Sequence, residues 1–163
     1  GVQQNFDKSL HYYNLSYKQN NQYGYFRIGT CYLNGYGVEP NYFRSFKYFG
    51  QLEKIGNPDA MNILGRLYEN NIGNNGKTIE YFGKSPESEN SLKSSIKNPF
   101  KQNFKKAIEY YEKASNLGNS EAMNNLGVLY ENGKGVKSNS TKAFEYYNES
   151  AKLGNSMAKE KLK

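Results

Sequence analysis

Residues 122–155 read AMNNLGVLYENGKGVKSNSTKAFEYYNESAKLGN, and this stretch decides the fold. Its apolar and aromatic residues recur three and four positions apart in two blocks, one on each side of Gly133 and Gly135. This spacing places them on one face of each of two helices. The stretch therefore predicts a helical hairpin, in which a glycine turn joins a first helix (helix A) to a second helix (helix B).

The same hairpin pattern recurs along the chain. Gly65 lies 62 residues before Gly127, and Gly29 lies 36 residues before Gly65. The aromatic pair at 146–147 recurs at 110–111, 48–49 and 12–13. A period of 36 residues, interrupted once by an insertion of 62 − 36 = 26 residues, explains these spacings. A fixed period of this length is typical of stacked helical hairpins.

These offsets predict one array over residues 1–163. It comprises a partial repeat (5–21), repeats at 22–57, 58–119 and 120–155, an insertion at about 75–101 and a partial repeat (156–163). Asparagines at positions 5, 41, 103 and 139 precede each helix B, where the side-chain oxygen can accept a hydrogen bond from a free helix amide. Because the chain opens on a helix B without its helix A, we expect a fragment of a longer protein.

Composition limits the classes of partner. The net charge of +7 comes from 22 basic and 15 acidic residues. Residues 76–106 hold seven lysines and three glutamates, 7 − 3 = +4, so the insertion and the start of the helix after it together carry more than half of the excess. Arginine, whose planar fork commonly recognises phosphates and bases, occurs only at positions 27, 44 and 66. Nucleic acid is therefore a disfavoured partner, although it stays open.

Other sequence features argue against a membrane span and a disulfide. No apolar run approaches the roughly 20 residues that cross a bilayer, so we expect no transmembrane segment in this soluble piece. Cys31 is the only cysteine, which rules out an intrachain disulfide and favours a packed thiol. The compartment stays open, with the cytoplasm slightly favoured over a secretory lumen.

At these residues the chain resembles the Sel-one-like repeat family, α-solenoid relatives of the tetratricopeptide repeat. The family pattern is Ala-x3-Leu-Gly-x2-Tyr-x2-Gly-x-Gly-Val, followed by Lys-Ala-x2-Trp/Tyr-Tyr-x-Lys-Ala-Ala-x2-Gly, and residues 122–154 match it nearly throughout. The resemblance implies an all-α fold, a right-handed α/α superhelix of helical hairpins. It also implies a protein-interaction scaffold or adaptor that holds a protein partner on a concave surface lined by helix A.

Candidate partner-binding residues follow from the helical period of helix A. About 100° of rotation per residue turns its third, seventh and tenth positions away from the alanine, leucine and tyrosine columns. These outward positions predict a partner-binding face, with a plain solvated face as the alternative. They are Phe26, Thr30, Leu33, Asn62, Arg66, Glu69, Asn124, Val128 and Glu131.

Glycine inside helix A costs about 1 kcal/mol relative to alanine, yet Gly29, Gly65 and Gly127 retain it in every repeat. Close approach by another helix is the expected compensation. Leucine at position 127 is therefore expected to force the two helices apart.

Catalysis has little basis in this sequence. The only histidine, His11, has no acid or nucleophile set around it, so we expect no enzyme activity. We also expect neither a cofactor nor a metal site. A regulatory repeat region of an enzyme, encoded elsewhere in a longer chain, remains an alternative.

The insertion is the most individual segment, and it is either a solvated spacer or a contact region. In the second interpretation the array is a basic module that binds an acidic surface or nucleic acid through this segment. Ser85 precedes Pro86, as in proline-directed phosphorylation sites. The contact candidates are Tyr81, Phe82, Ser85, Lys93 and Lys97.

Overall fold

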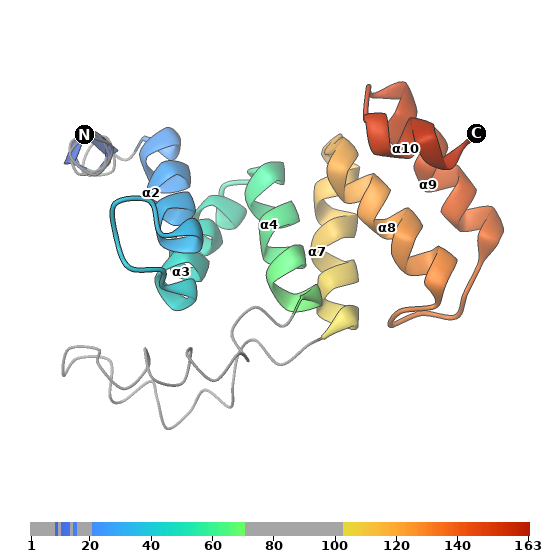
Figure 1. Cartoon of the computed structure of the whole chain (residues 1–163), viewed down its shortest axis with the longest axis horizontal. Coiled ribbons are helices and arrows are strands. Elements are labelled where there is room, and N and C mark those ends of the chain that lie inside the picture. Colours follow the sequence, from blue (N-terminus) through green and yellow to red (C-terminus); the bar gives the residue numbers. More distant parts are fainter. Residues whose placement is uncertain (1–8, 10, 14, 16–20, 71–102) are drawn as a thin grey trace. The chain divides into compact units, whose positions relative to one another are not determined.

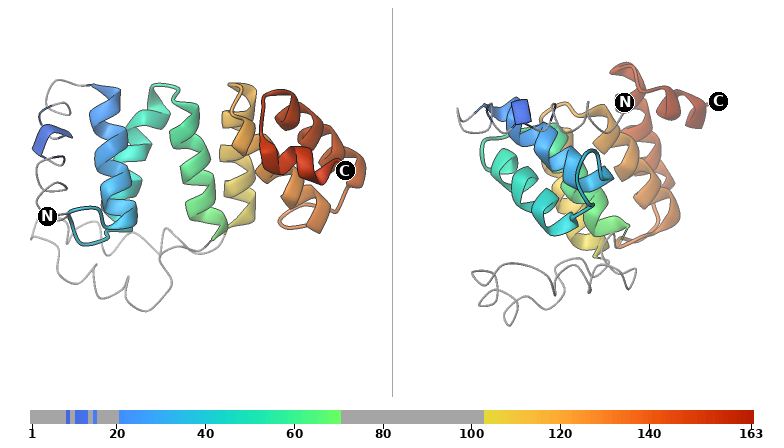
Figure 2. Two further views of the ribbon diagram at one scale, coloured as in Figure 1. Left: turned by 45° about the horizontal axis from the view of Figure 1, so that its top comes forward. Right: turned by 60° about the vertical axis from the view of Figure 1, so that its left-hand side comes forward.

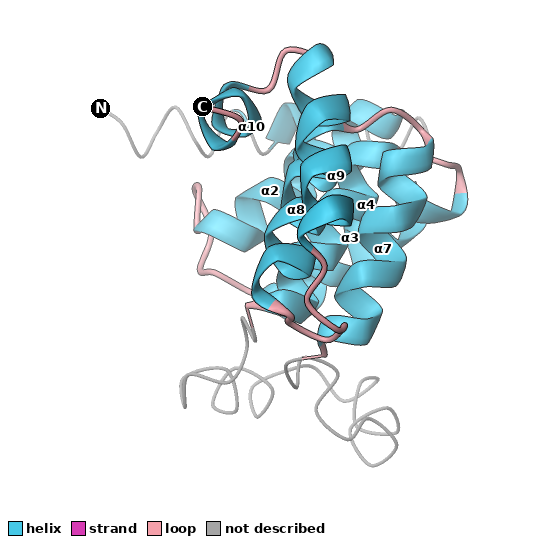
Figure 3. Cartoon of the chain, turned by 90° about the vertical axis from the view of Figure 1, so that its right-hand side faces the viewer, coloured by secondary structure: helices cyan, strands magenta, loops and turns pink. Residues whose placement is uncertain are grey.

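The computed structural model describes residues 9, 11–13, 15, 21–70 and 103–163 (Figure 1). All regular secondary structure in these residues is helical (Figure 3). The chain forms two compact units: unit 1 contains residues 1–55 and 71–101, and unit 2 contains residues 56–70 and 102–163. The insertion candidates Tyr81, Phe82, Ser85, Lys93 and Lys97 lie outside the described residues.

The described core of unit 1 is one helical hairpin. Its helix A is α2 (Gln22–Asn34) and its helix B is α3 (Tyr42–Lys54), as the repeat pattern predicts. The two helices pack against each other and bury Ile28, Phe49 and Leu52. Cys31 is also buried and unpaired, so the prediction of a packed thiol is confirmed.

Unit 2 contains two complete hairpins and a short additional helix. The helices are α4 (Pro58–Glu69), α7 (Phe104–Asn116), α8 (Ser120–Asn132), α9 (Ser140–Lys152) and α10 (Ser156–Lys161). Each packs on the next along the chain, and Figure 1 and the left view of Figure 2 show α4 beside α7. The alanine column of helix A is fully buried at Ala60, Ala122 and Ala158.

Asparagine caps begin the helices at regular positions. The side chains of Asn41, Asn103 and Asn139 accept hydrogen bonds from the backbone amides three residues later, which confirms the predicted caps of helix B. Asn5 lies outside the described part of the chain. In each repeat the backbone amide of the cap also donates to the carbonyl of the helix A tyrosine, with distances of 2.7–3.1 Å. This bond ties the start of helix B to the end of helix A.

Glycine ends each described helix B. Gly56, Gly118 and Gly154 have φ of 81°, 83° and 93°, the left-handed conformation that glycine commonly adopts just after a helix. The next residue, asparagine, caps the following helix. These stop and start signals set the period of the repeat.

Candidate functional site

The outer side of the first helices in unit 2 forms the candidate site. Helices α4 and α8 bury their leucines, whereas Arg66 and Glu131 are exposed and Glu69 and Val128 are half-buried. We call these four residues the helix A face. They are four of the residues predicted from the helical period.

Asn62 and Asn124 correct that prediction, because both are buried. The Asn62 amide donates to Glu121 Oε2 over 2.9 Å, and its oxygen accepts from Asn125 Nδ2 over 3.1 Å. Asn62 is therefore a contact between α4 and α8, not a free outward group. The helical period of a single helix missed this role because the neighbouring helix A covers the third position.

Asn124 is the equivalent residue one repeat later, and its surroundings differ. Its neighbour is α10, where Met157 and Lys161 stand in place of Glu121 and Asn125. The Asn124 Oδ1 atom is buried without a hydrogen-bond partner. The contact that Asn62 makes from α4 to α8 is thus not repeated by Asn124.

The predicted site residues of unit 1 pack within their own hairpin. Phe26 is half-buried and lies edge-on to Phe49, with ring centroids 5.5 Å apart. The Thr30 hydroxyl donates to the Phe26 carbonyl over 2.9 Å, and Leu33 is half-buried. None of these three is a fully exposed group.

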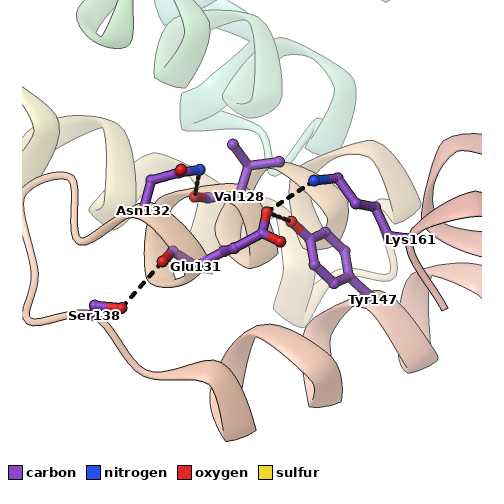
Figure 4. Close-up of polar contacts among 6 residues, drawn as sticks. All are labelled: Val128, Glu131, Asn132, Ser138, Tyr147 and Lys161. Carbon is purple, nitrogen blue, oxygen red and sulfur yellow. Dashed lines mark hydrogen bonds and ion pairs between the residues drawn. The ribbon is translucent and has the colours of Figure 1, made fainter.

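Glu131 has a fixed position on the helix A face (Figure 4). Its Oε2 atom accepts hydrogen bonds from Lys161 Nζ over 2.9 Å and from the Tyr147 hydroxyl over 2.8 Å. These donors stabilise the carboxylate and lower the pKa of Glu131, with Lys161 the larger cause. Burial, and then the hydrogen bond to Glu131, raise the pKa of Tyr147.

The pair of Glu131 and Tyr147 recurs one repeat earlier. The Tyr111 hydroxyl donates to Glu69 Oε2 over 2.7 Å, and Tyr111 is fully buried. Burial raises the pKa of Tyr111, and the Glu69 charge adds to this effect. The glutamate and the tyrosine each recur 62 and 36 residues apart in the sequence, at 69 and 131 and at 111 and 147, and this joint recurrence is the signal that predicts such a pair.

In unit 1 both members of the pair change together. Leu33 occupies the glutamate position and Phe49 the tyrosine position, so the first repeat has an apolar pair where the next two have a hydrogen-bonded one. If only one residue of the pair were replaced, the remaining tyrosine hydroxyl or glutamate carboxylate would have no hydrogen-bond partner at this position. The joint change indicates that the two columns form one structural unit.

The same aromatic rings explain the glycines inside helix A. A Cβ atom at Gly65 or Gly127 would lie 2.5 Å from the Cε1 atom of Tyr111 or Tyr147. At Gly29 the corresponding distance to Phe49 Cζ is 3.0 Å. The prediction that close approach of another helix accounts for these glycines is therefore confirmed.

A second aromatic contact holds each hairpin together at its turn. Tyr68 stacks on Tyr110 and Tyr130 stacks on Tyr146, both with ring centroids 5.6 Å apart. In unit 1 Tyr32 stacks on Tyr48 at 5.9 Å. A cation lies over the first ring of each pair, at 4.9–5.4 Å from its centroid; these cations are Arg44, Lys106 and Lys142.

The helix A face is suited to holding a partner by its side chains. It presents a cation, two carboxylates and an apolar group from two helices. Among the described residues, no group of three or more His, Cys, Asp or Glu side chains could hold a metal ion. No helix in this part of the chain is long and apolar enough to cross a membrane.

Comparison with known proteins identifies the repeat. The sequence profile of the Sel1 repeat matches residues 1–21, 22–52, 58–85, 98–119 and 120–155, well over half of the chain. A search of curated proteins finds no similar sequence.

Similar solved structures include a Sel1 repeat protein from Oxalobacter formigenes. It is 24% identical, with a TM-score of 0.67 over 95% of this chain and 97% of that chain. Another is Helicobacter pylori cysteine rich protein B, which is 21% identical, with a TM-score of 0.61 over 97% of this chain and 95% of that chain. These similarities confirm the predicted all-α solenoid class. Since the Sel1 repeat profile matches most of its length, the chain belongs to the Sel1 repeat family.

Proposed function

We propose that this chain is a non-enzymatic scaffold that holds another protein on the helix A face of unit 2. Sel1 repeat proteins generally act as protein-interaction scaffolds, and the repeat fold itself is a non-catalytic one. The observation that carries the proposal is the contrast between the two sides of α4 and α8. Their inner sides are buried leucines, whereas their outer sides present Arg66, Glu69, Val128 and Glu131.

The chemistry of this face favours a partner with mixed charge. Arg66 can pair with a carboxylate, and Glu131 can accept from a cation or an amide. Because Tyr147 and Lys161 already hold Glu131, this carboxylate loses little conformational freedom when a partner binds. Val128 is half-buried and packs against the core cluster that contains Tyr147, so only the exposed part of its side chain is open to a partner.

Site-specific photo-crosslinking tests the location of the partner. A photoreactive amino acid replaces Arg66 of the helix A face, or Asn132, which follows Glu131 of that face; both residues are exposed, on α4 and α8 respectively. Matched controls carry it at Lys113 or Glu145, which are exposed on the second helices α7 and α9. We expect one protein from a cell extract to crosslink at 66 and at 132 and not at the controls. Adducts at the controls alone, or no adduct at any position, would contradict the proposal.

The two alternative functions predicted from the sequence depend on residues outside the described part of the chain. Binding of an acidic surface or nucleic acid by the insertion depends on residues outside the described ranges. A regulatory role beside an enzyme depends on sequence beyond these 163 residues. Both stay predictions, as does the single array over residues 1–163.

A further inference from the structure

Five lysines gather at one end of the helices in unit 2. They lie on the first turns of α7 and α9 and on the turn that joins α8 to α9, on the lower side of the unit in Figure 1. All five are exposed. We call this set the lysine edge; its members are Lys105, Lys106, Lys134, Lys137 and Lys142.

A close backbone contact brings the two parts of the lysine edge together. A Cβ atom at Gly135 would lie 2.3 Å from Phe104 Cβ, so the turn packs directly on the first residue of α7. Gly135 has φ of 75° and lies between Lys134 and Lys137. The turn therefore places these two lysines beside Lys105 and Lys106.

Two members of the lysine edge are held in place by tyrosines. Lys106 Nζ lies 5.2 Å from the centroid of the Tyr68 ring, and Lys142 Nζ lies 4.9 Å from that of Tyr130. Lys142 also donates to the Tyr130 hydroxyl over 3.4 Å. Within the described ranges, Lys105, Lys134 and Lys137 make no ion pair or hydrogen bond with a side chain.

Charge is segregated within unit 2. The ends of α4 and α8, the turn and the first turns of α7 and α9 (residues 66–70, 103–107 and 131–143) hold six cations and two carboxylates, 6 − 2 = +4. The other described residues of unit 2 (56–65, 108–130 and 144–163) hold five cations and seven carboxylates, 5 − 7 = −2. Glutamates begin again on the second turns of α7 and α9, at Glu109 and Glu145. The net positive charge of the described part of unit 2 thus lies at these helix ends.

We propose that the lysine edge binds an acidic polypeptide segment, through residues other than the four of the helix A face. Rotatable ammonium groups suit a chain of carboxylates, whose spacing varies with side-chain conformation. The lysine edge contains no arginine, which is the usual residue for bidentate recognition of phosphates and bases. This composition favours an acidic protein segment over nucleic acid.

The apolar residues of unit 2 argue against a membrane surface as the partner. Leu117 and Leu153 are exposed, but they follow the far ends of α7 and α9, about 20 Å from the lysine edge. Phe144 is exposed on α9, but it lies about 200° around the helix from Lys142. Insertion into a bilayer needs apolar side chains beside the cations.

A pair of charge-matched variants tests the proposal. The edge variant carries Lys105→Glu, Lys134→Glu and Lys137→Glu. The control variant carries Lys152→Glu, Lys159→Glu and Lys163→Glu. Each lowers the net charge by six, from +7 to 7 − 6 = +1, and both leave the lysines over tyrosine rings intact. Circular dichroism checks that both variants remain helical.

The probe is a fluorescein-labelled polyglutamate peptide, whose binding is measured by fluorescence anisotropy at low and at physiological ionic strength. We expect the edge variant to bind at least about tenfold more weakly than the wild type, and the control variant to bind within about threefold of it. Equal weakening by both variants would show that net charge alone matters and would overturn the proposal.

Two further outcomes would also overturn it. One is a wild-type chain that does not bind the peptide even at low ionic strength. The other is that the chain binds duplex DNA or phosphatidylserine vesicles more tightly than polyglutamate, and that this binding depends on the same edge lysines. That result would assign another class of partner to the lysine edge. Crosslinking at Arg66 and Asn132 does not depend on these lysines, so a failure here leaves the proposed scaffold function standing.

Discussion

Replacing glycine by alanine within the helices tests the ring contact that holds each hairpin. In Gly127→Ala the new Cβ atom would lie 2.5 Å from Tyr147 Cε1, 2.7 Å from Cδ1 and 3.0 Å from Cζ. Ordinary contacts begin at about 3.4 Å, so the ring must move by about 0.9 Å. Tyr147 is only 4% exposed and its hydroxyl donates to Glu131, so such a shift disturbs both packing and a hydrogen bond.

The size of the effect follows from two opposing terms. Overpacking a closely packed interior typically costs about 1–3 kcal/mol. Alanine favours the helix over glycine by about 1 kcal/mol. Gly50 in α3 isolates the second term, because its φ is not positive and a Cβ atom there meets nothing within 4 Å. Gly50→Ala should therefore stabilise the chain by about 1 kcal/mol, and Gly127→Ala should be about 1–3 kcal/mol less stable than Gly50→Ala.

Thermal and urea unfolding, monitored by circular dichroism, measure these differences in the free energy of unfolding. For a chain of this size, each kcal/mol should change the melting temperature by about 2–4 °C. Stability in repeat arrays is local, so amide hydrogen exchange should locate each effect in its own hairpin. The predicted order of stability is Gly50→Ala, then Gly29→Ala at a 3.0 Å contact, then Gly65→Ala and Gly127→Ala at 2.5 Å. Equal stabilisation by all four substitutions would refute the ring contact as the reason for these glycines.

Three further predictions follow from the buried polar groups. Tyr111→Phe should destabilise the chain by about 1–2 kcal/mol by removing the bond to Glu69, and adding Glu69→Leu should recover most of the loss in urea unfolding, because unit 1 already has that apolar pair. Ser45→Ala should stabilise it by about 1 kcal/mol in the same assay, because the Ser45 hydroxyl is fully buried without a partner; a lower midpoint would show that the hydroxyl is bonded. The free energy of unfolding should fall above about pH 10. The pKa values of Tyr111 and Tyr147 are raised in the folded chain, so the unfolded chain loses these protons at a lower pH than the folded chain does. Each tyrosine should then lower the free energy of unfolding by up to about 1.4 kcal/mol per pH unit. Urea midpoints between about pH 10 and 11 measure this decline, and a slope that Tyr111→Phe leaves unchanged would contradict the assignment.

The hairpins and their caps could be predicted because they depend on local signals. Asn41, Asn103 and Asn139 each lie seven residues before the aromatic pair of helix B, and a cap needs only its own neighbouring amides. The internal glycines could be assigned to a close contact because they recur at a fixed position. Local chemistry and periodicity together therefore suffice for the elements of this fold.

The contacts between successive repeats could not be predicted from one helix alone. The outward direction of Asn62 is correct for an isolated α4, but its amide is used by Glu121 and Asn125 on the next helix A. Helical periodicity describes which residues share a face, not which neighbour covers part of that face. The sequence shows that Leu33 and Phe49 both differ from Glu69 and Tyr111 at the equivalent positions. Only the hydrogen bond between Glu69 and Tyr111 explains why the two positions change together.

Separation of the folding contacts from Lys105, Lys134 and Lys137 makes the lysine edge testable by substitution. The glycine and ring contacts, the stacked tyrosines and the tyrosine hydrogen bonds to Glu69 and Glu131 all lie within single hairpins. Lys105, Lys134 and Lys137 take part in none of these contacts. Exposed substitutions away from such features usually change stability by less than about 0.5 kcal/mol. A loss of binding in the edge variant, with an unchanged melting curve, would therefore report on recognition and not on folding.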